Sequence, residues 1–404
     1  MSVQAIKQAS EAAKRTILTM FLVGIVLIAV PVRAAPRSAS DSKDRIAFVA
    51  FYDDRPVSQK INIMTINPDG SDVQQLFSME NHYEIGMFGC GCAFMWAPDY
   101  KHLLFFAPFY APTSTFIIRT DGQGEKTYGS DYYQFKWSPD GLFLAFLYHK
   151  DRKFNNYEGT LYIADADGAN PHPFTDRAVT DFDWSPDGKQ LALSSRGDIF
   201  VAPIEGGAKL KRLATNDLNA DTIYWSPDGT KISFVYRSAL YLLDVKTQVR
   251  RKISDWVSYN GYAWSPDGRQ ILVNDALVDI QNGSHRPLPY PTNFNDYGTL
   301  KWSPDSSRLL YGKPEDNIPG WLFTWDLSAH NPIPLNLPAD NEDGYGIRDG
   351  VWSPDSSQIA YLLDRQICII NVDNTGHHCI SEADQYGQIG RLQWAHESGL
   401  RRSR

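Results

Sequence analysis

The stretch Trp184-Ser185-Pro186-Asp187-Gly188 decides the fold, because the same pattern recurs along most of the 404-residue chain. Its copies, full or variant, begin at Trp96, Trp137, Trp184, Trp225, Trp264, Trp302, Trp352 and Trp394. Neighbouring copies are between 38 residues apart (Trp264 to Trp302) and 50 residues apart (Trp302 to Trp352). A period near 40 residues, with several short strands in each unit, is typical of a β-propeller.

The motif has the residue chemistry of a tight turn between two strands. Proline at the second turn position fixes φ, aspartate next to it binds nearby backbone N–H groups, and glycine relieves the steric limit on the last residue. An indole buries a large apolar area. We therefore expect each repeat tryptophan to pack between adjacent units.

Composition supports an all-β protein and excludes one class of partner. The chain is 43% hydrophobic and 13% aromatic, and aromatic residues are enriched in strands. Its net charge of −8 argues against general nucleic-acid binding.

The N-terminal segment has the pattern of an export signal. Lys7, Lys14 and Arg15 precede an apolar run over residues 17–32, and small residues end at Ala34, which favours cleavage after Ala34. An uncleaved anchor over residues 16–32 is the alternative, and either reading predicts an extracytoplasmic protein, periplasmic or secreted. The predicted domains are a signal or anchor (1–34), a linker (35–43), a β-propeller (44–397) and a basic tail (398–404).

The strand pattern predicts how the ring closes. Three strands, over residues 45–51, 61–66 and 73–77, have no repeat tryptophan before them, whereas residues 389–394 form a first-strand signal with nothing after it. Joining the two gives an eight-bladed β-propeller of four-stranded antiparallel blades, closed by the C-terminal strand on the N-terminal blade, which covers open sheet edges. Seven blades, with one unit lost, is the alternative.

The repeat resembles that of the TolB-like propeller family over roughly residues 44–397. The fullest copy is residues 184–193, and residues 161–168 give the best third strand and turn. The resemblance implies the fold; similar blades occur in Tol-system periplasmic proteins, in prolyl oligopeptidase and dipeptidyl peptidase relatives and in some polysaccharide lyases. Two departures matter: the TolB α/β domain has no room between Ala34 and Arg45, and the Gly-x-Ser-x-Gly motif of the peptidases does not occur.

Long connections on one face of the ring form the first candidate binding surface, because irregular loops commonly carry function. They cover residues 52–59, 108–112, 149–157 and 313–320. The candidate binding residues in these face loops are Tyr52, Arg55, Phe109, Tyr110, His149 and Arg152. Solvated padding without a binding role is the alternative.

The blade-to-blade connections form the second candidate surface, since they lead into the innermost strands at the expected channel mouth. The candidate residues there are Tyr83, Asp131, Tyr132, Asp181, Asp183, Asp221, Tyr259, Asp296, Tyr297, Tyr345 and Tyr386. Tyrosine suits recognition, and acids would attract cations or basic partners. Repeat-derived packing is the alternative, and a divalent cation in the channel is left open although no dense ligand spacing supports one.

The four cysteines fall into two pairs. Cys368 and Cys379 lie on the expected third and fourth strands of the last blade, where a cross-strand disulfide is predicted. Cys90 and Cys92 are too close for an easy bridge and could be free, metal-binding or paired elsewhere.

No catalytic or cofactor motif is evident, so no catalytic residue, metal site or cofactor is predicted. The predicted function is a non-catalytic extracytoplasmic scaffold for a protein or peptide partner in the cell envelope. The partners exclude nucleic acid, and include a membrane only through an uncleaved N-terminal segment. An enzyme at the channel mouth, such as a polysaccharide lyase or hydrolase, and a carbohydrate-binding propeller are the alternatives.

Overall fold

The computed structural model describes residues 44–54, 58–81, 93–107, 114–149, 158–205, 209–214, 221–257, 262–288, 300–315, 318–329, 332–335, 337, 347–382 and 385–395. The predicted signal, linker and basic tail lie outside these residues. Within the described parts of the chain, no helix has the length and apolar composition needed to cross a membrane.

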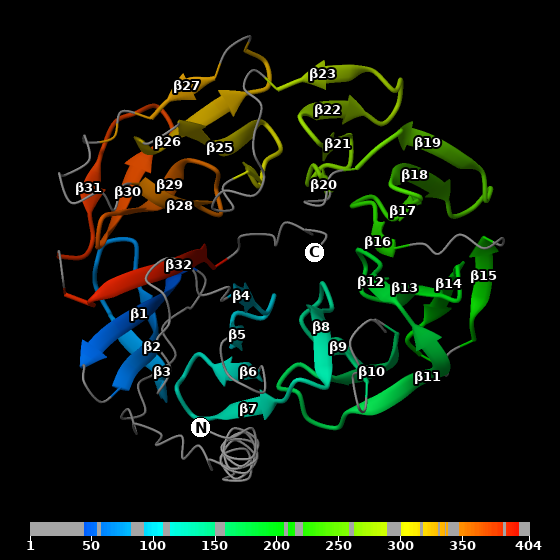
Figure 1. Ribbon diagram of the computed structural model, residues 1–404, viewed down its shortest axis with the longest axis horizontal. Coiled ribbons are helices and arrows are strands. Elements are labelled where there is room, and N and C mark those ends of the chain that lie inside the picture. The colour runs from blue at the N-terminus through cyan, green and yellow to red at the C-terminus, as the bar shows by residue number, and fades with distance from the viewer. Residues whose placement is uncertain are drawn as a thin grey trace, which may run out of the picture. The chain divides into compact units, whose positions relative to one another are not determined.

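Eight sheets of four antiparallel strands form a ring (Figure 1). The predicted all-β, eight-bladed propeller is confirmed, and the seven-bladed alternative is wrong. Each sheet is one blade, numbered from blade 1 at the N-terminal strands to blade 8. In blades 2 to 8 the four strands follow one another in sequence and are hydrogen-bonded in that order.

The strand bounds follow the repeat. Blade 1 comprises β32 (Gln388–Trp394), β1 (Ile46–Asp54), β2 (Ser58–Ile66) and β3 (Gln74–Asn81), and blade 2 comprises β4 (Ala93–Trp96), β5 (His102–Ala107), β6 (Ser114–Arg119) and β7 (Glu125–Tyr128). Blade 3 comprises β8 (Tyr132–Trp137), β9 (Phe143–Tyr148), β10 (Gly159–Asp165) and β11 (His172–Val179), and blade 4 comprises β12 (Asp181–Trp184), β13 (Gln190–Ser195), β14 (Asp198–Pro203) and β15 (Lys211–Ala214). Blade 5 comprises β16 (Asp221–Trp225), β17 (Lys231–Tyr236), β18 (Ala239–Asp244) and β19 (Arg250–Ser254), and blade 6 comprises β20 (Tyr262–Trp264), β21 (Gln270–Val273), β22 (Ala276–Asp279) and β23 (His285–Pro287). Blade 7 comprises β24 (Lys301–Trp302), β25 (Arg308–Glu315), β26 (Ile318–Asp326) and β27 (Ile333–Pro334), and blade 8 comprises β28 (Ile347–Trp352), β29 (Gln358–Leu363), β30 (Gln366–Asn371) and β31 (His378–Cys379).

Blade 1 closes the ring by combining both ends of the repeat array. The last strand, β32, pairs antiparallel with β1 in the register Ile46↔Trp394 and Ala47↔Gln393. The Ala395 N–H donates to the Arg45 carbonyl at 2.7 Å and continues this pairing. The predicted closure is confirmed, and β32 is the innermost strand of its blade (Figure 1).

The Ser-Pro-Asp-Gly segment forms the turn between the first and second strands. The Ser185 hydroxyl donates to Asp187 Oδ1 at 2.6 Å and accepts the N–H of Gln190 at 2.9 Å. Gly188 has φ +70° and donates its N–H to the Ser185 carbonyl at 2.9 Å, so the left-handed position favours glycine. The same Ser–Asp bond recurs at Ser138, Ser226, Ser265, Ser303 and Ser353.

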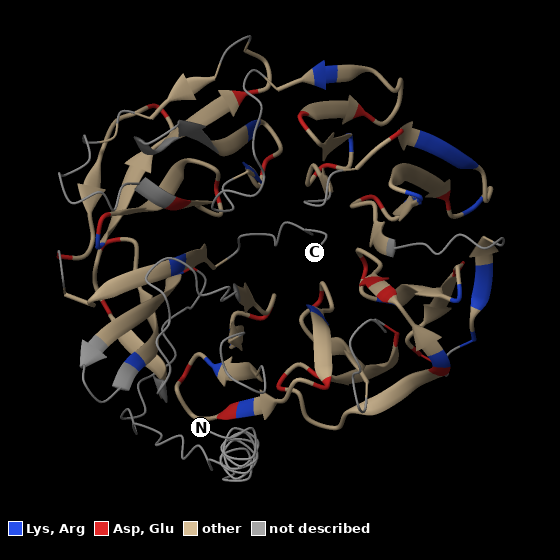
Figure 2. Cartoon of the chain, in the orientation of Figure 1, with Lys and Arg blue, Asp and Glu red and all other residues tan. Residues whose placement is uncertain are grey.

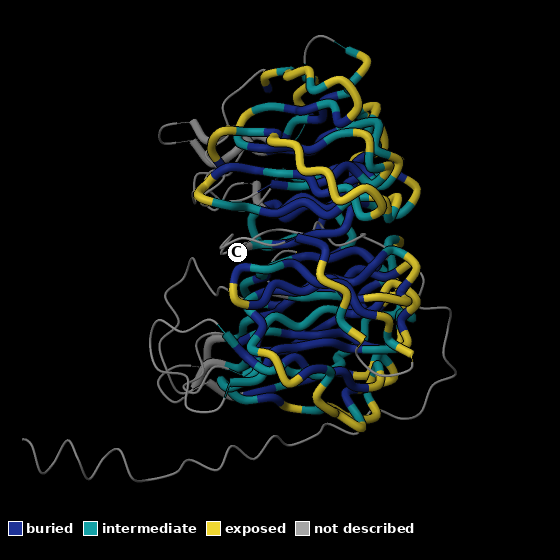
Figure 3. Tube along the Cα trace, turned by 90° about the vertical axis from the view of Figure 1, so that its right-hand side faces the viewer, coloured by how far each residue is buried: buried dark blue, intermediate teal, exposed yellow. Residues whose placement is uncertain are grey.

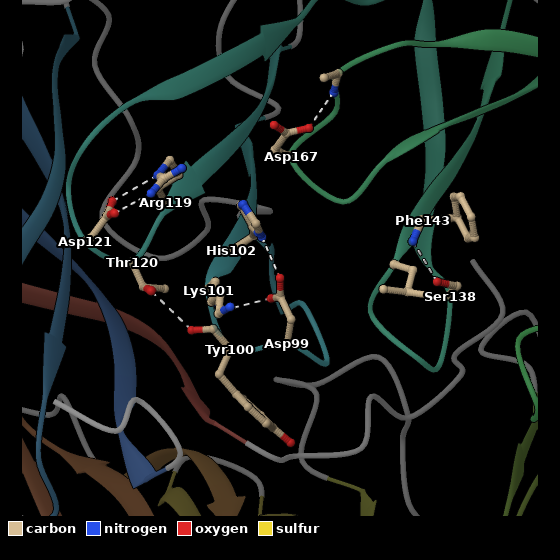
Figure 4. Close-up of polar contacts among 12 residues, drawn as sticks. Asp99, Tyr100, Lys101, His102, Arg119, Thr120, Asp121, Ser138, Phe143 and Asp167 are labelled. Carbon is tan, nitrogen blue, oxygen red and sulfur yellow. Dashed lines mark hydrogen bonds and ion pairs between the residues drawn. The ribbon is translucent and has the colours of Figure 1, made fainter. Parts of the chain in front are cut away.

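Blade 2 departs from this turn and compensates within it. Ala97 replaces the serine, and the His102 imidazole, five residues on, takes its place at 2.9 Å from Asp99 Oδ2 (Figure 4). Asp99 Oδ1 accepts the N–H of Lys101 at 2.8 Å. Burial raises the pKa of Asp99, but the hydrogen bonds from His102 and Lys101 outweigh this effect and lower it below the usual value.

The apolar core lies between blades rather than inside them. Each of the eight hydrophobic clusters formed by the described residues joins two neighbouring blades. The repeat tryptophans bridge these interfaces, as expected: Trp184 Nε1 donates to the Lys136 carbonyl of the preceding blade at 3.0 Å, and Trp352 Nε1 donates to that of Lys301 at 3.2 Å. Viewed from the side, the strands are largely buried and the exposed residues gather in the turns (Figure 3).

Candidate functional site

Many predicted binding residues lie outside the described part of the chain. From the expected channel mouth these are Tyr83, Tyr259, Asp296, Tyr297 and Tyr345, and from the face loops they are Arg55, Phe109, Tyr110 and Arg152. Asp221 begins β16, but its side chain is likewise outside the described residues. The others are Tyr52, Asp131, Tyr132, His149, Asp181, Asp183 and Tyr386, and their surroundings separate them into two groups.

The acids on β12 bind the neighbouring blade. Asp181 Oδ2 accepts the N–H of Ile223 at 2.7 Å, and Asp183 Oδ2 accepts the N–H of Trp225 at 2.8 Å. Both carboxylates are buried, although the acidic positions of β12 lie close to the centre of the ring (Figure 2). These contacts fit the packing alternative, because the Oδ2 atoms of both aspartates accept hydrogen bonds from backbone N–H groups of blade 5.

A lysine neutralises part of this buried charge. Lys136 Nζ lies 3.6 Å from Asp181 and 3.6 Å from Asp183, and it lies over the Tyr224 ring at 4.9 Å from the centroid. Burial raises the pKa of Asp181, opposed by Lys136 and by the backbone N–H groups of Ile223 and Phe182. Buried charges need such partners, so this cluster joins blades 3, 4 and 5.

Blade 8 repeats the arrangement with residues that the sequence analysis did not single out. Asp349 Oδ2 accepts the N–H of Leu392 at 2.6 Å, and Lys301 Nζ lies 3.7 Å from Asp349 Oδ1. Asp349 and Asp181 each stand three residues before a repeat tryptophan. That shared position is the signal that could have identified both as inter-blade contacts.

Tyr386 and Tyr52 belong to the core beside blade 1. Tyr386 is buried and its ring centroid lies 5.1 Å from that of Phe48. Tyr52, on β1, packs against the same cluster and is half-buried. Burial raises the pKa of both hydroxyls.

Blade 3 gathers the remaining predicted residues, Asp131, Tyr132 and His149, into one group with Tyr148 and Tyr162. These five residues are here called the tyrosine patch. Tyr132 begins β8 and pairs with Tyr148, the last residue of β9. Their ring centroids are 4.9 Å apart, and Tyr148 meets Tyr162 of β10 edge to face at 5.8 Å. All three residues are half-buried, and Tyr132 and Tyr162 also pack against the apolar cluster between blades 2 and 3.

Asp131 and His149 sit at the same end of the blade. The His149 N–H donates to the Asp131 carbonyl at 2.9 Å. The His149 Nδ1 atom is buried and has no hydrogen-bond partner among the described residues. Burial raises the pKa of Tyr132, and the charges of Tyr148, Tyr162 and Asp131 raise it further. The predicted Asp131, Tyr132 and His149 are thus brought together, whereas Tyr148 and Tyr162 are not among the predicted binding residues.

Blade 5 shows which part of this patch is common to the repeat. Tyr236 ends β17 as Tyr148 ends β9, and Tyr241 lies on the third strand as Tyr162 does. Their ring centroids are 6.2 Å apart. Tyr132 stands five residues before the repeat tryptophan of blade 3, and the corresponding residue of blade 5 is Ala220, so the added inner-strand ring distinguishes blade 3.

The two cysteines of blade 8 face each other. Cys368 of β30 pairs with Cys379 of β31 in register, and the two are joined by a disulfide. Cys90 and Cys92 lie outside the described residues.

No protein-family model matches the chain. The uncharacterized protein Atu1656 of Agrobacterium fabrum is 32% identical over 264 residues, which cover 56% of this chain and 82% of that protein. The chain belongs to the Atu1656 family. A second relative, the uncharacterized peptidase YuxL of Bacillus subtilis, is 24% identical over 189 residues. That match covers 44% of this chain but only 28% of the peptidase.

This member of the Atu1656 family is also similar to several solved structures. Dihydro-heme d1 dehydrogenase NirN in complex with DHE matches with a TM-score of 0.54 and 13% identity, over 92% of this chain and 80% of that one. Dipeptidyl peptidase 4 of Porphyromonas gingivalis matches with a TM-score of 0.51 and 12% identity, over 75% and 54%. TolB of Acinetobacter baumannii has a TM-score of 0.40 and 16% identity, over 74% and 66%. At these identities the likeness concerns fold alone.

Proposed function

We propose that the chain is a non-catalytic β-propeller that binds a protein partner in the cell envelope through the tyrosine patch of blade 3. The observation that carries this proposal is the row of half-buried rings formed by Tyr132, Tyr148 and Tyr162. Tyrosine supplies a large, rigid contact area at a low cost in conformational entropy. Packing of the rings against one another restricts them further, so less entropy is lost on binding.

The charge beside the rings indicates the chemistry of the partner. Asp131 lies close enough to Tyr132 to raise the pKa of its hydroxyl. A lysine or arginine of the partner would meet both a carboxylate and aromatic faces, and a cation over a tyrosine ring is stabilised by its quadrupole. We therefore propose a segment with apolar and basic side chains as the occupant.

The proposed location is extracytoplasmic. Its supports are the apolar run after Lys7, Lys14 and Arg15 and the Cys368–Cys379 disulfide, because disulfides persist in oxidising compartments.

The test places a photo-crosslinking amino acid at position 148 of the full chain in cells. Position 236, at the equivalent end of β17 on blade 5, is the matched control. We expect one protein to crosslink at position 148 and not at 236, and we expect the yield to fall about tenfold or more when Tyr132→Ala is added, since a central aromatic contact contributes about 2 kcal/mol or more.

Equal crosslinking from positions 148 and 236 would contradict the proposal. A purified chain that binds no protein but retains a sugar on a glycan array, with loss of binding in Tyr132→Ala, would favour the carbohydrate-binding alternative. Turnover of a polysaccharide, measured with and without a divalent metal, would favour an enzyme.

A further inference from the structure

Blade 8 brings two sulfur atoms and an imidazole together at its outer edge, away from the tyrosine patch. Cys368 lies opposite Cys379 in register, and His377 precedes Cys379 by two residues. Side chains two apart in an extended segment point to the same face. The potential ligand atoms of the three residues lie within 4.8 Å of one another.

The sulfur pair is reachable from one side. Cys368 is fully buried in the cluster between blades 7 and 8, whereas Cys379 is half-buried and His377 is exposed. A reducing thiolate can therefore approach through Cys379, and exchange depends on such access.

The two adjacent histidines differ in what they already bind. The His378 Nδ1 atom lies 2.8 Å from the Gly376 carbonyl. Among the described residues, the His377 imidazole makes a ring contact with Tyr361, at 6.1 Å between centroids, and no hydrogen bond. A nitrogen of His377 is thus available as a ligand.

We propose that Cys368, His377 and Cys379 bind a zinc-like divalent cation once the disulfide is reduced. A dithiol reductant supplies two electrons and two protons; the S–S bond breaks to give two thiols, and the reductant becomes a disulfide. Cation binding then releases both thiol protons, the imidazole provides the third ligand and water completes a tetrahedral site. Two thiolates and an imidazole form a ligand set that Zn²⁺ prefers.

The proposal links metal binding to redox state, because the same sulfur atoms cannot form the disulfide and bind the cation together. Cys368 is held on the buried strand β30 and Cys379 on its edge partner β31. The blade therefore presents both sulfurs from neighbouring backbones, and little rearrangement of the chain is needed to bring them to one ion.

The test uses Co²⁺ as a spectroscopic probe on the full chain carrying Cys90→Ser and Cys92→Ser. The protein is reduced with a phosphine, its two free thiols are counted, and the sulfur-to-cobalt charge-transfer absorption is followed during titration. We expect the reduced chain to bind a single equivalent and the oxidised chain to show no such absorption. Zn²⁺ should displace the Co²⁺.

Two single variants at exposed positions keep the proposal falsifiable without loss of a cysteine. His377→Ala should weaken Co²⁺ binding about tenfold or more, since even indirect partners of a metal contribute 10–100-fold, while His378→Ala should leave it unchanged. Reduced protein with two free thiols and no charge-transfer absorption would overturn the proposal. Equal affinity in His377→Ala and the parent would overturn it too, and neither result bears on the tyrosine patch.

Discussion

The Asp183→Ala substitution tests whether the buried acids of β12 hold blades 4 and 5 together. The carboxylate is 3% exposed, accepts the Trp225 N–H at 2.8 Å and lies 3.6 Å from Lys136 Nζ. Removing it leaves a buried N–H without this acceptor and removes one of the two carboxylates beside the half-buried Lys136 ammonium. Breaking a fully buried charged pair costs about 3–5 kcal/mol; because the Lys136 side chain is 24% exposed and keeps Asp181 as a partner, we expect a loss near the lower end of this range, about 3 kcal/mol, in the free energy of unfolding.

Two comparison variants separate the bond from general damage. Asp183→Asn keeps an oxygen for the Trp225 N–H but not the charge, so we expect a loss of about 1–2 kcal/mol. Asp187→Ala, in the exposed turn of the same blade, removes the bonds from Ser185 and Lys189 and should cost about 1 kcal/mol.

Urea unfolding followed by tryptophan fluorescence gives the overall loss, and hydrogen exchange of the Trp225 amide gives the local one. We expect exchange at Trp225 to accelerate in Asp183→Ala far more than in Asp187→Ala. If the two alanine variants lose equal stability and protect the Trp225 amide equally, the reasoning about the inter-blade carboxylates is refuted.

The other predictions concern pH and an unsatisfied hydroxyl. Hydrogen bonds from the turn serines and from following backbone N–H groups lower the pKa of Asp187 and Asp355 below 3.8. The contribution of these two carboxylates to the free energy of unfolding is therefore present above about pH 3.8 and is lost as the pH falls through their pKa in the folded protein. Acid titration of the unfolding free energy should show this decline, and Ser185→Ala with Ser353→Ala should flatten it; an unchanged slope would contradict the assignment. The Tyr361 hydroxyl is buried without a hydrogen-bond partner among the described residues, so Tyr361→Phe should raise the free energy of unfolding by up to about 1 kcal/mol, and a loss measured in urea would show that the hydroxyl is satisfied.

The ring could be predicted because its spacing is written into the chain. Each turn requires a proline, an aspartate and a left-handed residue at fixed positions, and each blade interface requires a tryptophan. The remnant at Trp394 decided between seven and eight blades, since it supplies the innermost strand beside Ile46.

The tyrosine patch and the inter-blade aspartates could not be predicted from the sequence in the same way. The position of a residue along its strand does not specify which groups of the next blade its side chain contacts. Asp131 comes directly before the innermost strand of blade 3, and Asp181 begins the innermost strand of blade 4. The Asp181 carboxylate nevertheless binds the backbone of blade 5, whereas Asp131 lies beside the Tyr132 ring of blade 3. Tyr148 and Tyr162 join Tyr132 only through strand register. Such contacts depend on the relative placement of three strands, which a repeat pattern does not contain.

The pairing of β32 with β1 also sets the order in which the molecule can assemble. Blade 1 lacks its innermost strand until the residues around Trp394 are available, so the first blade begun during synthesis is the last to be completed. Full closure must therefore wait until β32 has been synthesised, which keeps the nascent polypeptide open longer than a domain whose neighbouring segments pair as they emerge. For a chain proposed to leave the cytoplasm, this delay favours passage through a translocation channel before the ring locks.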